Sequence, residues 1–301
     1  MDGSGRGSAR SLWRPRTSPV HCLKLPTGTS ARRVAATAPP GAQSRVPRAP
    51  LPGLTVLFRD DHLVAVHKPS GLLVHRTSLD AHETRFAMQI LRRQLGRRVY
   101  PVHRLDKGAS GVLLFALDPE TAAALGALVR GHGLERTYLA VVRGSTAEDG
   151  VIDHPLVRRL DPAERPPGSR DGATSDGASL EAVTRYRRLA TVELPHRVDR
   201  YPTSRYSLLE LQPLTGRRHQ LRRHLAHASH HIVGDSTYGK GRHNRLFAEL
   251  FGSRRLLLAC VELRLVHPAT GEPLVVSAPL AEEFASVVAA LGWTSALASG
   301  R

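Results

Sequence analysis

An α+β fold, with a mainly antiparallel β-sheet core flanked by helices, is the architecture that the sequence predicts. Short runs of aliphatic and β-branched residues outnumber the segments with helical spacing, and the helical segments stand singly between those runs. No internal repeat is visible. A regular alternation of strand and helix would predict a parallel βαβ arrangement instead, so this pattern favours α+β.

The first expected elements are a hairpin and a helix. Apolar runs at 55–58 and 63–66 flank an Asp-Asp turn, which is typical of two antiparallel strands. A helix is expected over 83–95, where apolar residues including Ile90 recur at helical spacing and Gly96 provides a stop.

Two strands and a helix are expected next. The run 112–116 is entirely apolar and follows Gly111, which indicates a buried strand. Pro119 favours the first turn of a helix over 119–129. Residues 137–142 are then rich in β-branched and aromatic side chains, so a second strand is expected there.

A long polar excursion over 161–178 interrupts the pattern before the strands resume. Strands are expected over 181–188 and 206–211, and a helix over 217–226 buries Leu221 and raises several arginines to the surface. The remaining expected elements are a helix over 244–250, strands over 256–266 and 273–277, and a helix over 281–291.

These elements divide the chain into three parts. Residues 1–52 are rich in Ser, Pro, Arg, Gly and Ala, carry nine Lys and Arg against one Asp, and lack apolar periodicity. This composition predicts a disordered basic leader, and we favour an unstructured tail or an upstream start codon over an organelle transit peptide. The folded domain is expected over 53–292, followed by a C-terminal tail at 293–301.

The charge of the chain predicts a polyanionic partner. Lys and Arg number 43 against 26 Asp and Glu, for a formal net charge of +17, and nucleic acid is the first candidate. Cys22 and Cys260 form neither a disulfide framework nor a metal-ligand spacing, which favours a reducing environment. No apolar run is long enough for a transmembrane helix and no secretory signal is evident, so we expect a cytoplasmic protein without a membrane partner.

One acidic side chain stands where a reactive group would be expected. Asp106 lies on a predicted loop between two strands, with Arg104 and Lys107 close by in the sequence. Such a carboxylate can be a nucleophile or a general base. On spacing alone, however, a surface salt bridge is the better interpretation, because exposed Asp beside Arg and Lys is common.

The surrounding motifs decide between these interpretations. Three blocks occur in order: HRLDK at 103–107 with SGVLL at 110–114, RTYLAVVRG at 136–144, and LTGRRHQLR at 214–222 with IVGD at 232–235. Together they resemble the RluA-type family of pseudouridine synthases, over about residues 55–292. The resemblance implies the pseudouridine synthase fold and the isomerisation of uridine in RNA.

Finer features resemble one branch of that family, whose members modify a uridine in the T arm of certain tRNAs. The segments are KPSGLLVHR at 68–76, RYPTSRY at 200–206 and RRHLAH at 222–227. The leader and the long excursion at 161–178 depart from the family pattern, which leaves the choice of RNA open between tRNA and ribosomal RNA.

The resemblance also assigns roles to individual residues. It implies that Asp106 is the nucleophile, that Tyr138 stacks on the base and moves a proton, and that Arg222 holds the charge of Asp106. Arg217 is the second choice for that guanidinium. Without the family, Tyr138 would be interpreted as a core tyrosine and Arg222 as a solvated helix arginine. The reaction is an isomerisation without redox change, so no cofactor and no metal are expected.

A uridine stacked in an RNA stem must be flipped out to reach a carboxylate, at a cost of roughly a few kcal/mol. Phosphate contacts have to offset this cost, and aromatic residues, at 5%, are too few for stacking to dominate. Recognition of a structured RNA, expected to be tRNA, follows. The predicted RNA-binding residues are Arg104, Lys68, Arg217, Arg218 and Arg223, with Arg92, Arg93, Arg97 and Arg98 as further phosphate contacts. The resemblance implicates Arg104 in opening the RNA helix. Lys68 has a structural role as its alternative.

Three competing hypotheses remain weaker. The histidines at 219, 224, 227, 230 and 231 could indicate a metal site, but no acidic residue or cysteine at helical spacing completes a ligand set. A non-catalytic RNA-binding protein would explain the charge but not the motifs. A hydrolase using His103 and Asp106 lacks a nucleophile elbow. We expect a monomer with no protein partner.

Overall fold

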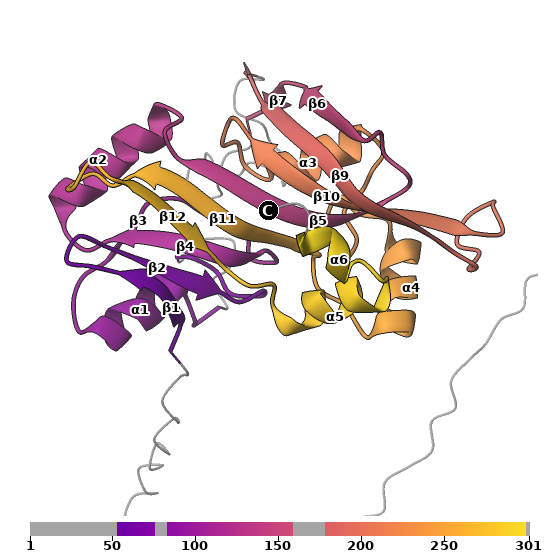
Figure 1. Ribbon diagram of the computed structural model, residues 1–301, viewed down its shortest axis with the longest axis horizontal. Coiled ribbons are helices and arrows are strands. Elements are labelled where there is room, and N and C mark those ends of the chain that lie inside the picture. The colour runs from indigo at the N-terminus through magenta and orange to yellow at the C-terminus, as the bar shows by residue number, and fades with distance from the viewer. Residues whose placement is uncertain (1–52, 76–82, 159–177, 299–301) are drawn as a thin grey trace, which may run out of the picture. The chain divides into compact units, whose positions relative to one another are not determined.

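A single mixed sheet organises the folded unit. The computed structural model describes residues 53–75, 83–158 and 178–298 (Figure 1). Within these residues ten strands form one sheet, whose main path is β1 (Thr55–Arg59), β2 (Leu63–Lys68), β4 (Ser110–Ala116), β11 (Leu258–Val266), β5 (Glu135–Arg143), β10 (Ser204–Pro213), β9 (Val183–Leu194) and β6 (Asp149–Asp153). Off this path, β12 (Pro273–Ser277) pairs with β11, β3 (Tyr100–Pro101) pairs with β4, and β7 (Leu156–Val157) pairs with β8 (Ser179–Leu180) in a separate small sheet.

Neighbouring strands are antiparallel throughout this sheet except at one place. β4 and β11 run parallel, with Ala259 opposite Ser110 and Cys260 opposite Gly111. Gly111 has a φ of 111°, and a Cβ built on it would lie 1.9 Å from the Cys260 carbonyl oxygen, so only glycine fits between the two strands. The predicted α+β class with a mainly antiparallel sheet is confirmed.

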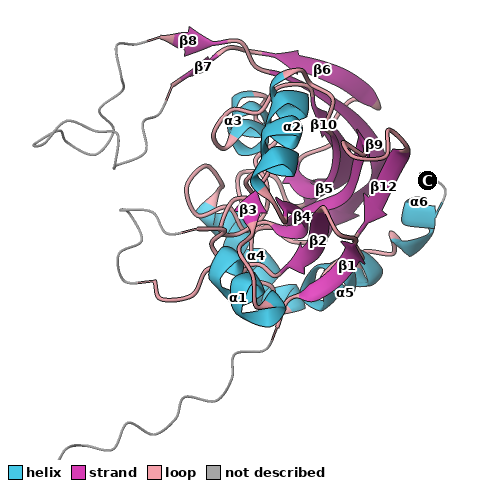
Figure 2. Ribbon diagram, turned by 90° about the vertical axis from the view of Figure 1, so that its left-hand side faces the viewer, coloured by secondary structure: helices cyan, strands magenta, loops and turns pink. Residues whose placement is uncertain are grey.

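The helices are α1 (Ala87–Leu95), α2 (Pro119–Arg130), α3 (Gln220–His227), α4 (Gly241–Phe251), α5 (Glu282–Ala290) and α6 (Thr294–Ala298) (Figure 2). The second of them starts as the sequence predicts, because the Asp118 side chain caps it by accepting from Thr121 N at 2.7 Å. Three predicted helix starts are wrong, and one of these is α4, which begins at Gly241, three residues before the predicted start. The first helix begins at Ala87 because Phe86 forms an extended bridge with Leu73, and α3 begins at Gln220, three residues after the predicted start.

The central strands bury both of their faces. Alternate residues of β5, among them Tyr138 and Ala140, pack in one hydrophobic cluster with Leu221 and Leu225 of α3. The residues between them pack in a second cluster with α4 and α5, where Phe247 is a large contributor. This alternation places α3 and Tyr138 on the same side of the sheet.

Parts of the predicted organisation fall outside the described residues, namely the leader at 1–52, the polar excursion as far as residue 177, and residues 299–301. The carboxyl end of the folded unit continues past residue 292, since Trp293 is buried and α6 follows it. In the described part of the chain no helix is long and apolar enough to cross a membrane.

Candidate active site

Asp106 lies on a loop between β3 and β4, and backbone contacts on both sides hold this loop. Ala109 N donates to the Asp106 carbonyl at 3.1 Å, which closes a turn directly after the carboxylate. Gly71 N donates to the Lys107 carbonyl at 2.8 Å, and Ser70 Oγ donates to the Gly108 carbonyl at 2.6 Å. The turn at 69–72 therefore fixes the loop, and the Asp106 side chain is 17% exposed.

Lys68 completes this support from the interior. Its side chain is fully buried, and Nζ donates to the carbonyls of Leu72 at 2.7 Å, Pro69 at 3.0 Å and Lys107 at 3.3 Å. Burial lowers the pKa of Lys68 to about 7. Of the two roles expected for Lys68, the structure favours the structural one, because the ammonium group is not on the surface where RNA phosphates would bind.

Arg222 reaches Asp106 from the first turn of α3. Its Nη1 donates to Asp106 Oδ2 at 3.1 Å, while Nε and Nη2 donate to the two carboxylate oxygens of Asp235 at 2.8 Å each. Burial alone would lower the pKa of Arg222, but the hydrogen bonds and charges of Asp235 and Asp106 outweigh it and raise the pKa above its usual value. One buried guanidinium thus bridges two carboxylates.

Asp235 is the fixed end of this bridge. Its side chain is 1% exposed, and Oδ1 also accepts from the backbone N–H groups of Thr237 and Tyr238 at 2.8 and 2.9 Å. Burial raises the pKa of Asp235, but the Arg222 hydrogen bond and these backbone donors more than compensate, so the pKa lies below its usual value. An ionised Asp235 therefore aims Arg222 at Asp106.

Tyr138 stands on β5, beside Asp106 in the same cavity. This cavity has a volume of about 70 Å³. Tyr138 is 7% exposed, and burial raises its pKa well above the usual value, so the phenol is neutral and can donate a proton in a hydrogen bond. Cys260 is its neighbour across the β5–β11 ladder.

Cationic side chains also line the cavity. Arg104 lies in the Asp106 loop, and Arg217 and Arg218 lie in the loop before α3. The buried side chain of Gln220 shapes that second loop: its Oε1 accepts from Thr215 Oγ1 at 2.7 Å and from Arg217 N at 3.0 Å. These hydrogen bonds hold the loop in a non-helical conformation, and the helix begins only at Gln220.

The other predicted side chains lie away from the cavity. Arg223 is half-buried on α3 and does not line it, and His103 is buried, with Nε2 accepting from Leu114 N at 3.2 Å. Arg92 and Arg97 each donate to a backbone carbonyl. Among the described residues no group of three His, Cys, Asp or Glu is arranged to hold a metal ion.

Comparisons with known proteins agree with this geometry. The family model described as RNA pseudouridylate synthase matches residues 62–227. The chain belongs to this family. It is 48% identical to tRNA pseudouridine synthase C of Vibrio cholerae, over 81% of this chain and 98% of the relative, and 46% identical to the protein of that name from Yersinia pestis, over 80% and 92%.

Solved structures of the family show the same fold. Human RNA pseudouridylate synthase domain containing 4 superposes with a TM-score of 0.58 at 28% identity, covering 79% of this chain and 93% of that one. Human RNA pseudouridylate synthase domain containing 1 superposes with a TM-score of 0.56 at 25% identity, covering 80% and 96%. The predicted resemblance to pseudouridine synthases is thereby confirmed.

Sequence reasoning did not assign Asp235 and His219 to this site. Asp235 stands in a motif block but carried no expected role, and its position opposite Arg222 is a long-range contact. His219 was considered only as a metal ligand. It has a left-handed φ of 54° just before α3, its Nδ1 lies 3.1 Å from Tyr238 Oη, and its Nε2 lies 3.9 Å from Asp106 Oδ1.

His219 is neutral at physiological pH, because burial lowers its pKa to about 4 despite the opposing charge of Asp106. Arg222, whose Nη1 lies 3.1 Å from Asp106 Oδ2, therefore supplies a positive charge directly at this carboxylate. The arrangement offers an oriented carboxylate, a neutral phenol and cations around one cavity. This combination suits nucleophilic attack on a nucleotide whose base enters beside the phenol.

Proposed function

We propose that the protein converts a uridine in the T arm of tRNA into pseudouridine, with Asp106 as the nucleophile. The observation that carries the proposal is the buried chain of contacts from Asp235 through Arg222 to Asp106, at 2.8 and 3.1 Å. It holds a partly exposed carboxylate at a cavity lined by Tyr138. Such an arrangement keeps the carboxylate oriented before the substrate arrives.

The substrate uridine must leave the RNA stack to meet Asp106. Flipping a base costs a few kcal/mol, and contacts to the RNA backbone supply compensating free energy. Arg104, Arg217 and Arg218 surround the cavity and are positioned to bind phosphates on either side of the flipped nucleotide. In this proposal, Arg104 also takes the space that the base has left.

The reaction breaks the N1–C1′ bond of uridine and forms a C5–C1′ bond. Asp106 adds to the nucleotide, at the sugar or at the uracil ring, and leaves again after the base has turned. Tyr138 stacks on the ring and its neutral hydroxyl exchanges a proton with it. The proton on C5 is lost and N1 gains one, so substrate and product are isomers and no oxidant or energy source is consumed.

The tRNA substrate rests on the named relatives and on the charge of the chain. Proteins called tRNA pseudouridine synthase C match about four fifths of this chain at 46 to 48% identity. The net charge of +17 suits a folded polyanion, and tRNA matures in the cytoplasm, where we infer that the enzyme acts as a monomer.

Mapping pseudouridine in tRNA tests this proposal. The full chain would be incubated with tRNA transcripts and with ribosomal RNA, and pseudouridines would be located at single-nucleotide resolution. We expect a new pseudouridine in the T arm of particular tRNAs and none in transcripts in which that uridine is replaced by cytidine. Modification only in ribosomal RNA would overturn the choice of substrate. Absence of pseudouridine in every RNA would leave an RNA-binding protein without catalysis.

A further inference from the structure

Arg136 is a further cation that lines the cavity, in addition to Arg222 and the three arginines of the bordering loops. It stands on β5 two residues before Tyr138, so both side chains project from the same face of the strand, about 7 Å apart along it. Both residues line the cavity that holds Asp106. Arg136 is therefore placed beside the site where the flipped base would stack.

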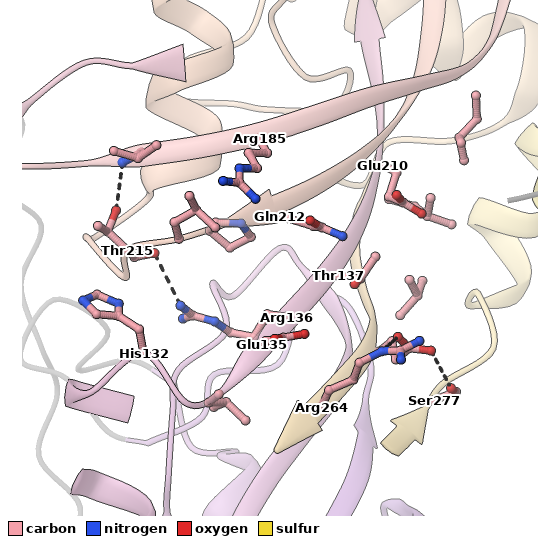
Figure 3. Close-up of a pocket in the computed structure, with 18 of the residues that line it drawn as sticks. His132, Glu135, Arg136, Thr137, Arg185, Glu210, Gln212, Thr215, Arg264 and Ser277 are labelled. Carbon is pink, nitrogen blue, oxygen red and sulfur yellow. Dashed lines mark hydrogen bonds and ion pairs between the residues drawn. The ribbon is translucent and has the colours of Figure 1, made fainter. Parts of the chain in front are cut away.

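Strands β5 and β10 separate near Arg136. β5 and β10 are paired as far as Tyr138 opposite Leu211, whereas Arg136 pairs with β11 and Pro213 pairs with β9. The side chain of Arg136 spans this opening and points towards Thr215 (Figure 3). The guanidinium thus lies between the active cavity and a larger hollow of about 750 Å³, and it lines both.

The guanidinium has few partners there. Nη2 donates to the Thr215 carbonyl at a long 3.4 Å, and within the described chain Nε is buried with no hydrogen-bond partner. No carboxylate of the described residues lies within ion-pair distance of Arg136, in contrast to Arg222, which is held by two. A guanidinium can donate five hydrogen bonds, and the described residues accept few of them from Arg136.

The absence of a side chain at Gly216 leaves space for the Arg136 guanidinium. A Cβ built on Gly216 would lie 3.4 Å from Nη1 of Arg136, so the guanidinium packs directly under the turn that leads to α3. Arg136 as a whole is only half-buried, but a buried Nε donor without a hydrogen-bond partner is unfavourable. A bound ligand with oxygen acceptors would supply the missing hydrogen bonds.

The charge of Arg136 acts inside the active cavity. The pKa of Tyr138 is raised chiefly by burial, but the charge of Arg136 opposes this increase. The pKa of Cys260, across the ladder, is raised by burial to about 12 and is opposed by Arg136 in the same way. A positive potential from Arg136 therefore reaches the place where the base would lie.

We propose that Arg136 donates hydrogen bonds to a carbonyl oxygen of the flipped uracil and stabilises the negative charge of the ring while it is detached from the sugar. This inference rests on the proposed function. When the N1–C1′ bond breaks, its electron pair stays on the ring and is shared between N1 and the O2 and O4 oxygens. The ring becomes neutral again when C5 bonds to C1′, C5 loses its proton and N1 is protonated. A donor fixed at such an oxygen lowers the barrier because it is oriented in advance.

The uracil carbonyl is favoured over a phosphate as the ligand. Arg136 shares its strand face with Tyr138, and its Nε is buried beneath the Thr215–Gly216 turn. Arg104, Arg217 and Arg218 lie on the loops that border the cavity, where the RNA backbone would pass. The base and the backbone would therefore be bound by different arginines.

Arg136→Gln, Arg136→Lys and a matched control, Arg264→Gln, test this role. Arg264 also lines the larger hollow but not the active cavity, and its side chain is 58% exposed. Single-turnover rates, tRNA affinity with its salt dependence, and thermal stability would be measured for each. For Arg136→Gln we expect a rate lower by about 100-fold or more, with tRNA affinity and its salt dependence unchanged. Arg136→Lys should recover part of the rate, and Arg264→Gln should match the wild type.

Substitution of the target uridine by 2-thiouridine or 4-thiouridine separates the possible ligands. Sulfur is a weak hydrogen-bond acceptor, so one thio-substituted tRNA should slow the wild type but should not slow the Arg136 variants further. Additive losses would overturn the proposal. So would an unchanged rate, or an affinity loss with a salt slope reduced by about one, which indicates a phosphate contact. Pseudouridine formation by the wild type keeps these outcomes distinct from a failure of the proposed function.

Discussion

Replacement of Asp235 by Asn tests whether the buried carboxylate holds Arg222 in its working position. Asn at this site can retain one oxygen for Arg222 Nη2 and for the two backbone donors of Thr237 and Tyr238. Its amide NH₂ then replaces Oδ2 and faces Arg222 Nε, so a bond of 2.8 Å becomes a contact between two donors.

The magnitude follows from these contacts. A charge-assisted hydrogen bond contributes about 1.5 to 3 kcal/mol, and removal of one partner from a buried ion pair costs about 3 to 5 kcal/mol. Because Asn keeps part of the network and Arg222 keeps Asp106, we expect the free energy of unfolding to fall by about 3 kcal/mol. A displaced guanidinium should also slow the single-turnover reaction by about 100-fold.

Urea unfolding and single-turnover pseudouridine formation measure the two effects. Asp199→Asn is a matched control, since Asp199 also pairs with an arginine, Arg143 at 3.0 Å, but its side chain is 39% exposed and it does not line the active cavity. It should lose less than about 1 kcal/mol and keep its rate. An Asp235→Asn protein with wild-type stability and a rate within threefold of wild type would refute the reasoning.

Two further predictions concern Lys68 and Tyr138. Burial lowers the pKa of Lys68 to about 7 in the folded state, while the unfolded chain keeps this proton up to about pH 10.4, so the unfolded state binds more protons between these values. Stability should therefore rise with pH from about 7, by up to about 1.4 kcal/mol per pH unit, and urea midpoints of a Lys68→Met variant should lack this rise; parallel curves would contradict it. Tyr138→Phe keeps the ring but removes the hydroxyl, so tRNA affinity should stay within threefold while the single-turnover rate falls by about 100-fold or more; an unchanged rate would exclude a proton-transfer role.

Local signals in the sequence predicted several elements of the fold directly. The run Val112–Ala116 is apolar at every position and forms the interior of β4, and Pro119 marks the first turn of α2. The strand 273–277 coincides with β12. In each case the signal lies within a few residues of the element, so no tertiary contact is needed to recognise it.

Other features depend on contacts between distant residues. The helix predicted from residue 217 begins at Gln220, because the Gln220 side chain binds Thr215 and Arg217 and keeps them out of the helix. β6 and the two short strands that follow it have weak local signals and were not predicted. Their positions are set by pairing with β9 and with each other.

The site shows the same division. Motif resemblance pointed to Asp106, Tyr138 and Arg222, and the structure places all three at one cavity. The anchoring of Arg222 by Asp235 could not be derived from spacing, because the two residues are 13 positions apart and only the fold brings their side chains together. The burial of Lys68 likewise reflects the tertiary packing of the Asp106 loop against the turn at 69–72.

Release of tritium from tRNA labelled at C5 of uridine tests the central claim most directly, because C5 loses its hydrogen only when it bonds to the sugar. The wild type, Asp106→Ala and a control, Asp61→Asn, in which an exposed carboxylate outside the cavity is neutralised, would be compared on the same tRNA. Wild type and Asp61→Asn should release tritium, whereas Asp106→Ala should bind the tRNA and release none. Equal release by Asp106→Ala, or no release by the wild type across varied tRNAs, would contradict the assignment of Asp106 as the nucleophile of a pseudouridine synthase.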